Sequence, residues 1–211
     1  MGRAGWHPAH WFAAALVAVL CACQSSPLPP VGNLDGILAG ESLTPDTAAL
    51  VIYRLEDGRT WTSSGERPAK RFVAASTSKI PHTLIALETG AVSEPDEWFE
   101  WDGETRFLPS WNESQDFATA FQRSTVWIYQ TITPRIGSAT LGDWLAKFGY
   151  GNADTGGEAD IQTYWLKGPL KISAREQVAF LARVSARTLP LSARTYEHAL
   201  PMMLAQEGDG W

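Results

Sequence analysis

The order of its elements most restricts what this chain can fold into, because strand patterns come first and helical patterns follow. Residues 48–55 are rich in β-forming side chains, Asp57-Gly58 is a typical hairpin turn, and the strand pattern resumes at 59–62. After residue 76 the spacing of apolar residues is mostly helical. The sequence therefore predicts an α+β domain in which an antiparallel hairpin precedes a helical block.

The helical block contains several separate patterns. The first helix is expected from Thr77 to Leu87, with Pro81 in its first turn and Gly90 as its stop. Residues 98–112 form an irregular aromatic stretch, and residues 27–45, rich in Pro, Gly and Ser, are expected to form a linker and a first turn. Further helices are expected at 117–124, 126–132, 141–148, 174–187 and 193–204. A lone hairpin is marginally stable, so this layout is expected to need further strands.

The N-terminal segment has the pattern of a bacterial export signal. Residues 11–22 form an apolar run after Arg3 that is too short to cross a bilayer comfortably. The run ends in Leu20-Cys21-Ala22-Cys23, which resembles a lipobox, where the chain is cleaved before the last cysteine and that cysteine is lipidated. The alternative is an ordinary cleaved signal that releases a soluble periplasmic protein.

This pattern predicts the organisation of the chain. Residues 1–22 are expected to be a lipoprotein signal peptide, residues 23–45 a tether and residues 46–211 one globular domain. The protein would then be exported to the periplasm and anchored to the outer membrane through the lipid on Cys23. The membrane is therefore an expected partner, through that lipid alone.

Composition excludes several classes of function. The formal net charge of −6 gives no attraction for the phosphate backbone, so no nucleic-acid partner is expected. Cys21 and Cys23 are the only cysteines, and the four histidines have no metal-ligand spacing, so neither a disulfide framework nor a metal site is expected. His82 and His198 are expected to lie on the surface or to be hydrogen-bonded.

The tetrad Ser76-Thr77-Ser78-Lys79 carries the clearest chemistry in the sequence. Ser and Lys three positions apart on a helix share a face. A serine hydroxyl is a weak nucleophile that needs a base, and a lysine can serve when apolar surroundings lower its pKa. The tetrad follows the apolar stretch 72–75 and precedes Ile80-Pro81, so it does not lie on a plainly polar face. The alternative interpretation is a helix cap beside a solvated lysine.

Further motifs follow the tetrad in order. They are Trp101-Asp102-Gly103, Pro109-Ser110-Trp111-Asn112, Ser124-Thr125-Val126-Trp127, Tyr150-Gly151-Asn152 and Trp165-Leu166. Together with the tetrad they resemble the class D β-lactamases, the oxacillinases, from about Arg71 to the end of the chain. The resemblance implies a β-lactamase/transpeptidase-like fold. It also implies hydrolysis of a β-lactam antibiotic, of the penicillin or oxacillin type, with resistance as the consequence.

The resemblance implies a role for each matching residue. Ser76 would attack the β-lactam carbonyl and be acylated. Lys79 would be N-carboxylated by carbon dioxide, with no other cofactor, and would act as the general base. Ser124 would relay protons near the leaving nitrogen. Val126 would form part of the apolar wall around Lys79, and Trp165 would donate its indole N–H to the carbamate. Tyr150, Gly151 and Asn152 would form a structural element near the site.

Two features depart from the family pattern. Ser78 stands where the family usually has Phe. Loss of that ring is expected to remove apolar cover, admit water and keep Lys79 charged, so that carboxylation and deacylation weaken unless Trp165 and Val126 supply enough cover. No Lys-Thr-Gly or Lys-Ser-Gly tripeptide occurs in the sequence. The domain is therefore expected to be incomplete, without its C-terminal sheet strands and without one donor of the oxyanion hole.

Two other functions remain open from the sequence. A penicillin-binding sensor would be acylated at Ser76 without efficient turnover. An inert fragment, or a Trp-rich lipoprotein that binds the cell wall, would form no adduct at all. The sequence predicts no oligomeric state.

Overall fold

The computed structural model describes residues 34–204 of the chain. The predicted signal peptide at 1–22, Cys23 and the first part of the predicted tether lie outside these residues. Within 34–204, no helix combines the length and the apolar character needed to span a bilayer.

A short helix, α1 (Leu34–Gly40), lies in the segment expected to be a linker. Leu34 and Leu38, four residues apart, share one face of this helix, and both are buried. The expectation of a linker throughout 27–45 is therefore wrong for these residues. An apolar pair at helical spacing outweighs the Pro and Gly residues on either side of it.

The predicted N-terminal hairpin is present. Strands β1 (Val51–Tyr53) and β2 (Thr60–Thr62) pair antiparallel, with Ile52 opposite Trp61. Gly58 in the connecting turn has a φ of +71°, a conformation that residues with a Cβ rarely adopt. The Asp-Gly signal thus marks the turn correctly, although the paired strands are shorter than the β-rich run in the sequence.

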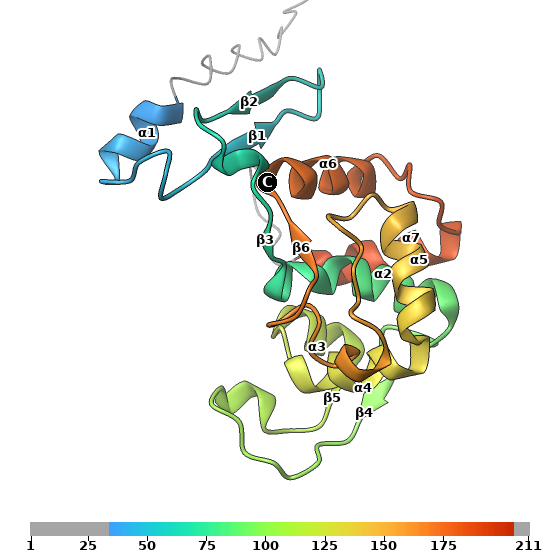
Figure 1. The fold of residues 1–211 in the computed structure, drawn as a ribbon. Helices are drawn as coiled ribbons and strands as arrows, with labels where there is room; N and C mark the ends of the chain where they lie inside the picture. Colours follow the sequence, from blue (N-terminus) through green and yellow to red (C-terminus); the bar gives the residue numbers. More distant parts are fainter. Residues whose placement is uncertain (1–33, 205–211) are drawn as a thin grey trace, which may run out of the picture. The chain divides into compact units, whose positions relative to one another are not determined.

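Six helices form the predicted block after the hairpin. They are α2 (Lys79–Thr89), α3 (Phe117–Gln122), α4 (Val126–Ile136), α5 (Ser138–Lys147), α6 (Ala174–Ser185) and α7 (Ala193–Met203). Each lies where a helical pattern was predicted, with ends shifted by a few residues. Helix α2 contacts α4, α5 and α7 and ends at Gly90 in the left-handed conformation (Figure 1). Because its residues from Pro81 to Leu87 are all buried, α2 is the centre of the core.

Side chains at the start of α6 tie this helix to the segment before the tetrad. Ser173 and Glu176 form a reciprocal capping box. The Glu176 carboxylate also accepts hydrogen bonds from Arg71, with Nη2 at 2.5 Å. The Arg71 hydrogen bond is the main reason why the pKa of Glu176 falls to about 2. Glu176 is therefore ionised at neutral pH and holds Arg71 against α6.

Two pairs of very short strands were not predicted. Strand β3 (Phe72–Val73) pairs antiparallel with β6 (Lys171–Ile172), and β4 (Trp98–Phe99) pairs antiparallel with β5 (Gln115–Asp116). A two-residue strand is too short to show alternation in the sequence, and here its partner lies far along the chain. The first pair matters for the site, because β3 leads into the tetrad.

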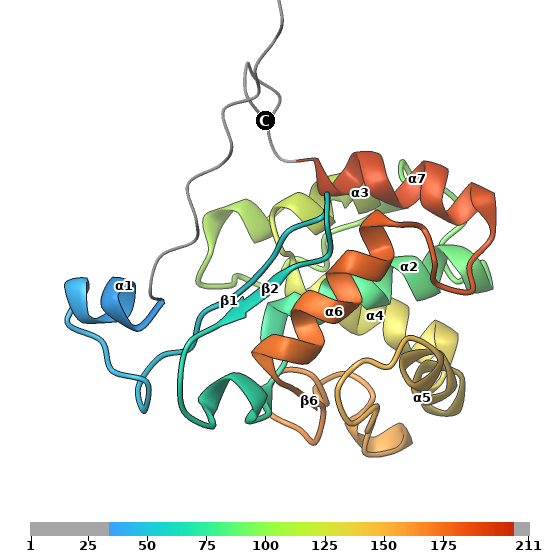
Figure 2. The same ribbon diagram turned by 90° about the horizontal axis from the view of Figure 1, so that it is seen from above.

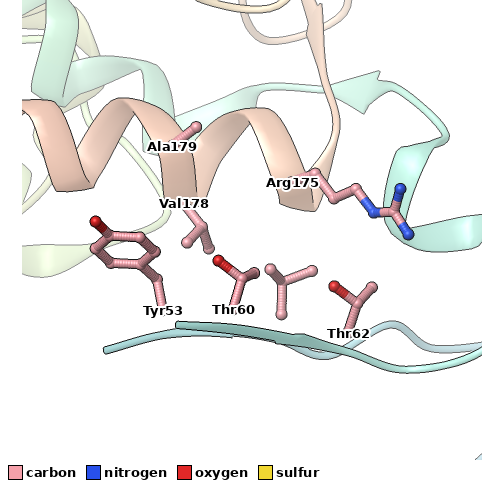
Figure 3. Close-up of a pocket in the computed structure, with 7 residues that line it drawn as sticks. Tyr53, Thr60, Thr62, Arg175, Val178 and Ala179 are labelled. Carbon is pink, nitrogen blue, oxygen red and sulfur yellow. The ribbon is translucent and has the colours of Figure 1, made fainter. Parts of the chain in front are cut away.

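The hairpin lies alongside α6, as the view from above shows (Figure 2). A groove of about 350 Å³ lies between them, lined among others by Tyr53, Thr60 and Thr62 of the hairpin and Arg175, Val178 and Ala179 of α6 (Figure 3). Among residues 34–204 each strand has one partner strand, and Ile52 and Leu55 are 38% and 61% exposed. Within this part of the chain, each strand therefore keeps one edge without a partner strand, and apolar side chains of the hairpin are exposed.

Gly151 lies where two backbone segments touch. Its φ is +58°, and a Cβ added there would lie 2.0 Å from the carbonyl oxygen of Lys171. The next residue fixes the same crossing, because the Asn152 backbone N–H donates to the Lys171 oxygen at 3.0 Å and its Nδ2 donates to the Pro169 oxygen at 2.8 Å. Only glycine fits at this position.

Replacing this glycine tests the close approach. Gly151→Ala is expected to lower the free energy of unfolding by about 3 kcal/mol, from left-handed strain plus overpacking. Gly90→Ala is the matched control, because Gly90 has a φ of +72° but nothing within 4 Å of the added Cβ. It is expected to cost only about 1 kcal/mol. Urea unfolding measures both, and equal losses would contradict the backbone contact.

Candidate active site

The tetrad lies where strand β3 passes into helix α2. A single 3-10 turn, η2 (Ala75–Ser78), carries Ser76 and continues directly into α2 at Lys79. Ala75 has a φ of +48°, in the left-handed region, and its N–H donates to the carbonyl of Trp165 at 2.8 Å. This strained and anchored residue turns the chain so that Ser76 is exposed while Lys79 is buried.

The hydroxyl groups of the tetrad have different partners. Those of Thr77 and Ser78 each donate to the backbone carbonyl three residues earlier, at 2.6 Å. The Ser76 Oγ instead accepts a hydrogen bond from the Lys79 Nζ at 3.0 Å. Neither Ser76 nor Thr77 caps a helix, because α2 begins only at Lys79. Ser76 therefore has the one tetrad hydroxyl that faces a base.

Lys79 is a buried amine without a carboxylate partner. Lys79 is only 2% exposed, and it forms no salt bridge with any of the described residues. Burial disfavours the ammonium form and lowers the pKa of Lys79 to about 8. A substantial fraction of the amine is therefore neutral at slightly alkaline pH and can accept the proton of Ser76.

Helix α4 covers Lys79 from one side. Val126, its first residue, is partly buried against the core. The Tyr129 ring centroid lies 5.4 Å from the Lys79 Nζ, and the Tyr129 hydroxyl shares a hydrogen bond of 2.7 Å with Thr83. Sequence reasoning placed Val126 beside the lysine but gave Tyr129 no role. Its position three residues after Val126, on the same helix face, was the available signal.

Ser78 does not open this environment to water. It is fully buried, and its hydroxyl is occupied by the Ala75 carbonyl. Contrary to the expectation, Ser78 therefore does not leave Lys79 hydrated, because Lys79 is itself buried. The expected effect of Ser78 on carboxylation stays a prediction. Cover for Lys79 comes from the neighbouring helix, through Tyr129, and does not depend on a large side chain at position 78.

The backbone N–H of Ser76 is free to bind an anion. Within 34–204 it donates to no other atom, whereas the N–H groups of Ala75, Thr77 and Lys79 on either side all have carbonyl partners. A free N–H on the nucleophile itself is suitably placed for the negative charge that develops on an attacked carbonyl oxygen.

Ser124 lies in the turn between α3 and α4 with a φ of +57°. The residues on both sides of it are fixed. The Trp111 Nε1 donates to the Arg123 carbonyl at 3.0 Å, and the Thr125 Oγ1 donates to the Gln115 Oε1 at 2.7 Å. The partly exposed Ser124 hydroxyl makes no hydrogen bond with Ser76, Lys79 or any other described residue. Its orientation is thus set by the backbone alone.

The element Tyr150-Gly151-Asn152 links the tetrad to β6. The Tyr150 hydroxyl lies 3.3 Å from the Thr77 Oγ1, and its buried ring packs edge-on against Phe180 at 5.0 Å. The Asn152 Oδ1 accepts the N–H of Lys171 at 2.9 Å. These contacts hold backbone segments together and leave Ser76 untouched.

Trp165 lies next to the tetrad and is fully buried. Its carbonyl oxygen accepts the N–H of Ala75, the residue before the nucleophile. Its indole Nε1 has no hydrogen-bond partner in the described part of the chain. An indole N–H can only donate, and a buried donor without an acceptor costs free energy, so this position favours an acceptor on a bound group.

Comparison with known proteins assigns this site to a family. Residues 60–210 match the family model of the penicillin binding protein transpeptidase domain. Beta-lactamase OXA-2 of Salmonella typhimurium is 39% identical over 145 residues, which are 69% of this chain and 52% of that protein. Beta-lactamase OXA-48 of Klebsiella pneumoniae is 36% identical over 157 residues, 74% of this chain and 58% of that protein. The solved structure of FUS-1 (OXA-85), a class D beta-lactamase from Fusobacterium nucleatum subsp. polymorphum, has a TM-score of 0.77 and 32% identity, and the match covers 82% of this chain and 70% of that one.

The chain belongs to the class D β-lactamase family. Both the resemblance noted in the sequence and the predicted α+β, β-lactamase/transpeptidase-like fold are thereby confirmed. The chain spans about half the length of the curated relatives it matches. The roles of the individual site residues stay predictions.

One histidine of this class D chain is buried on the helix that carries Lys79. His82 lies three residues after Lys79 on α2 and is fully buried, and its hydrogen bond to Tyr164 agrees with the expectation of a surface or hydrogen-bonded histidine. Its Nε2 lies 2.5 Å from the Tyr164 hydroxyl, but its Nδ1 has no partner among residues 34–204. The spacing between Lys79 and His82 was the sequence signal that the two side chains lie close together, because residues three apart share a helix face.

No cluster of three or more His, Cys, Asp or Glu side chains suited to a metal ion occurs in the described ranges. His198 is partly buried, and its Nδ1 lies 3.2 Å from Glu94, far from the tetrad in sequence.

Replacing the buried amine tests its cost to stability. The folded-state pKa of about 8 lies below the ordinary value of 10.5, so the unfolded state binds more protons between these values and stability rises with pH across that window. The penalty is fully present below pH 8, at about 3 kcal/mol, and is offset by about 1 kcal/mol from the Ser76 hydrogen bond. Lys79→Met is therefore expected to stabilise the protein by about 2 kcal/mol at pH 7, with the gain fading toward pH 10.5.

Urea unfolding at pH 7 and pH 10 measures this difference. Lys167→Met is the matched control, because Lys167 is exposed and is expected to change little at either pH. A Lys79→Met variant that loses stability at pH 7, or gains the same amount at both pH values, would contradict a desolvated amine.

Proposed function

We propose that Ser76 is acylated by β-lactam antibiotics of the penicillin and oxacillin type and that the ester is then hydrolysed, which would confer resistance. The Ser76 Oγ forms a bond to the β-lactam carbonyl carbon, the carbon–nitrogen bond of the ring breaks, and the ring nitrogen takes a proton. Water then cleaves the ester, releasing the opened acid and the free serine. The observation that carries the proposal is the buried Lys79 Nζ at 3.0 Å from the Ser76 Oγ.

Lys79 supports the first step as a base. With a pKa of about 8, roughly a quarter of the amine is neutral at pH 7.5. A neutral amine within hydrogen-bond reach takes the hydroxyl proton as the oxygen attacks. Because the amine is buried without a carboxylate partner, no nearby negative charge stabilises its ammonium form and raises its pKa again.

Two other groups would stabilise the negative carbonyl oxygen and supply the proton for the leaving nitrogen. The free backbone N–H of Ser76 would stabilise the carbonyl oxygen as it becomes negative. The Ser124 hydroxyl, which has no protein partner in 34–204, is free to pass a proton to the leaving nitrogen. Its left-handed backbone, with Arg123 and Thr125 held on either side, fixes the direction of its Cα–Cβ bond.

The lysine environment also fits carboxylation by carbon dioxide, which needs a neutral amine in a dry site. Trp165, with its buried and unpartnered indole N–H, would hold the added group, and Val126 and Tyr129 would exclude water from it. When bound, the group supplies a carboxylate, a base suited to activating the hydrolytic water. Tyr150, Gly151 and Asn152 act only by holding η2 and β6 in place.

Mass spectrometry of the intact protein after incubation with benzylpenicillin tests the proposal. The wild-type chain and Ser78→Ala are expected to gain the mass of one penicillin, because the Ser78 hydroxyl is buried against the Ala75 carbonyl. Ser76→Ala is expected to gain none. An adduct that survives in Ser76→Ala, or its absence from all three proteins, would overturn the assignment. An adduct that persists for hours would indicate a penicillin sensor instead of a hydrolase.

We propose, separately, export to the periplasm and anchoring to the outer membrane through a lipid on Cys23. The apolar run at 11–22 and the lipobox-like Leu20-Cys21-Ala22-Cys23 support this. In a Gram-negative host the wild-type chain and the control Cys21→Ser are expected in the membrane fraction. Cys23→Ser is expected to lose membrane anchoring, and equal partitioning of the two variants would speak against lipidation at Cys23.

A further inference from the structure

His82 is a second buried polar group beside Lys79 that the proposed reaction does not use. It lies one helical turn after Lys79, and its ring packs edge-on against the Trp165 ring, with centroids 5.0 Å apart. Its Nε2 contacts the Tyr164 hydroxyl at 2.5 Å, and its Nδ1 is buried without a partner among the described residues. The imidazole is neutral, because burial and the nearby Lys79 charge lower its pKa to about 3.

The hydrogen-bond partners around His82 favour one tautomer of its ring. Tyr164 is fully buried, and within 34–204 its hydroxyl has no other partner than the His82 Nε2. If Nε2 carried the proton, the phenolic hydrogen would have no acceptor and Nδ1 would be an unused acceptor as well. If Tyr164 donates to Nε2, the only group left without a partner is the Nδ1–H. The second arrangement leaves fewer buried groups unsatisfied.

This tautomer leaves two buried donors without a partner. The Nδ1–H of His82 and the indole N–H of Trp165 are both buried, both unpartnered and carried by rings in contact. Two donors cannot satisfy each other, so a group with several acceptor oxygens is needed.

We propose that His82 is a second hydrogen-bond donor, beside Trp165, to the carboxylate oxygens of N-carboxylated Lys79, in the tautomer that Tyr164 selects. The inference rests on the carboxylation included in the proposed function. In that step the neutral Nζ forms a bond to the carbon of carbon dioxide and releases one proton to solvent, which leaves one negative charge. A neutral imidazole can fill this role, because its Nδ1–H donates a hydrogen bond although the buried ring carries no charge.

Two isosteric substitutions separate the two ring nitrogens. The amide nitrogen of asparagine lies near the position of Nδ1, so His82→Asn keeps a donor there and gives up the Tyr164 contact. The longer glutamine reaches the position of Nε2, so His82→Gln keeps the Tyr164 contact and gives up the donor. Carbon-13 NMR of the full chain in ¹³C-bicarbonate reports the carbamate directly, without any need for turnover. Lys79→Met identifies the signal, because it must abolish it.

The half-saturating bicarbonate concentration is the quantity to compare. His82→Gln is expected to raise it about tenfold or more, the usual effect of losing a hydrogen bond to a charged group, and Trp165→Phe by a similar factor. His82→Asn is expected to stay within about threefold of the wild type. Circular dichroism confirms that each variant is folded, which separates loss of the donor from loss of the fold.

Three results would overturn the inference: a wild-type affinity in His82→Gln, an equal loss in both His82 variants, or no carbamate signal in the wild-type chain. Its failure is distinguishable from failure of the proposed acylation. A carbamate signal without a penicillin adduct on Ser76 would remove the acylation and leave His82 in place. A penicillin adduct without a carbamate signal would support the acylation of Ser76 and remove the role of His82.

Discussion

The burial of the Lys79 amine beside Ser76 is the interaction on which the site depends. In the described residues no carboxylate offsets the charge of this lysine, and burial is the one cause that lowers its pKa. Part of the amine is neutral near neutral pH, and so able to accept the Ser76 proton, only because the folded chain removes water from it. That removal costs stability, so the packing around the lysine must be strong enough to sustain it.

The helical block supplies this packing without help from the hairpin. Helix α2 is buried at the centre, α4 brings the Tyr129 ring over the amine, and the Trp165 carbonyl anchors the residue before Ser76. The hairpin, by contrast, leaves apolar side chains exposed and packs on α6 across an open groove. The part of the site that activates the nucleophile is therefore built by segments between residues 71 and 172.

Local signals in the sequence were sufficient for much of this arrangement. Asp57-Gly58 marked the hairpin turn, apolar spacing marked six helices, and the spacing of Ser76 and Lys79 put the two side chains on one face. The features that the sequence did not predict depend on contacts with residues far away in the chain. The two-residue strands β3 and β6 form only by pairing with each other, and they lie about a hundred residues apart in the sequence. The burial of Lys79 beside the small Ser78 could not be predicted, because Tyr129, about fifty residues later, contributes the cover. The full burial of His82 could not be predicted either, because Tyr164 and Trp165 enclose it and neither is near it in the sequence.

Direct titration of Lys79 tests the central claim most closely. Carbon-13 NMR of protein labelled at the lysine Cε, in buffer free of carbon dioxide, follows each amine separately, and the resonance missing from Lys79→Met identifies this one. A midpoint near pH 8 is predicted, because burial disfavours the ammonium form. A midpoint near 10.5, the ordinary value for lysine, would show a solvated ammonium and contradict the account.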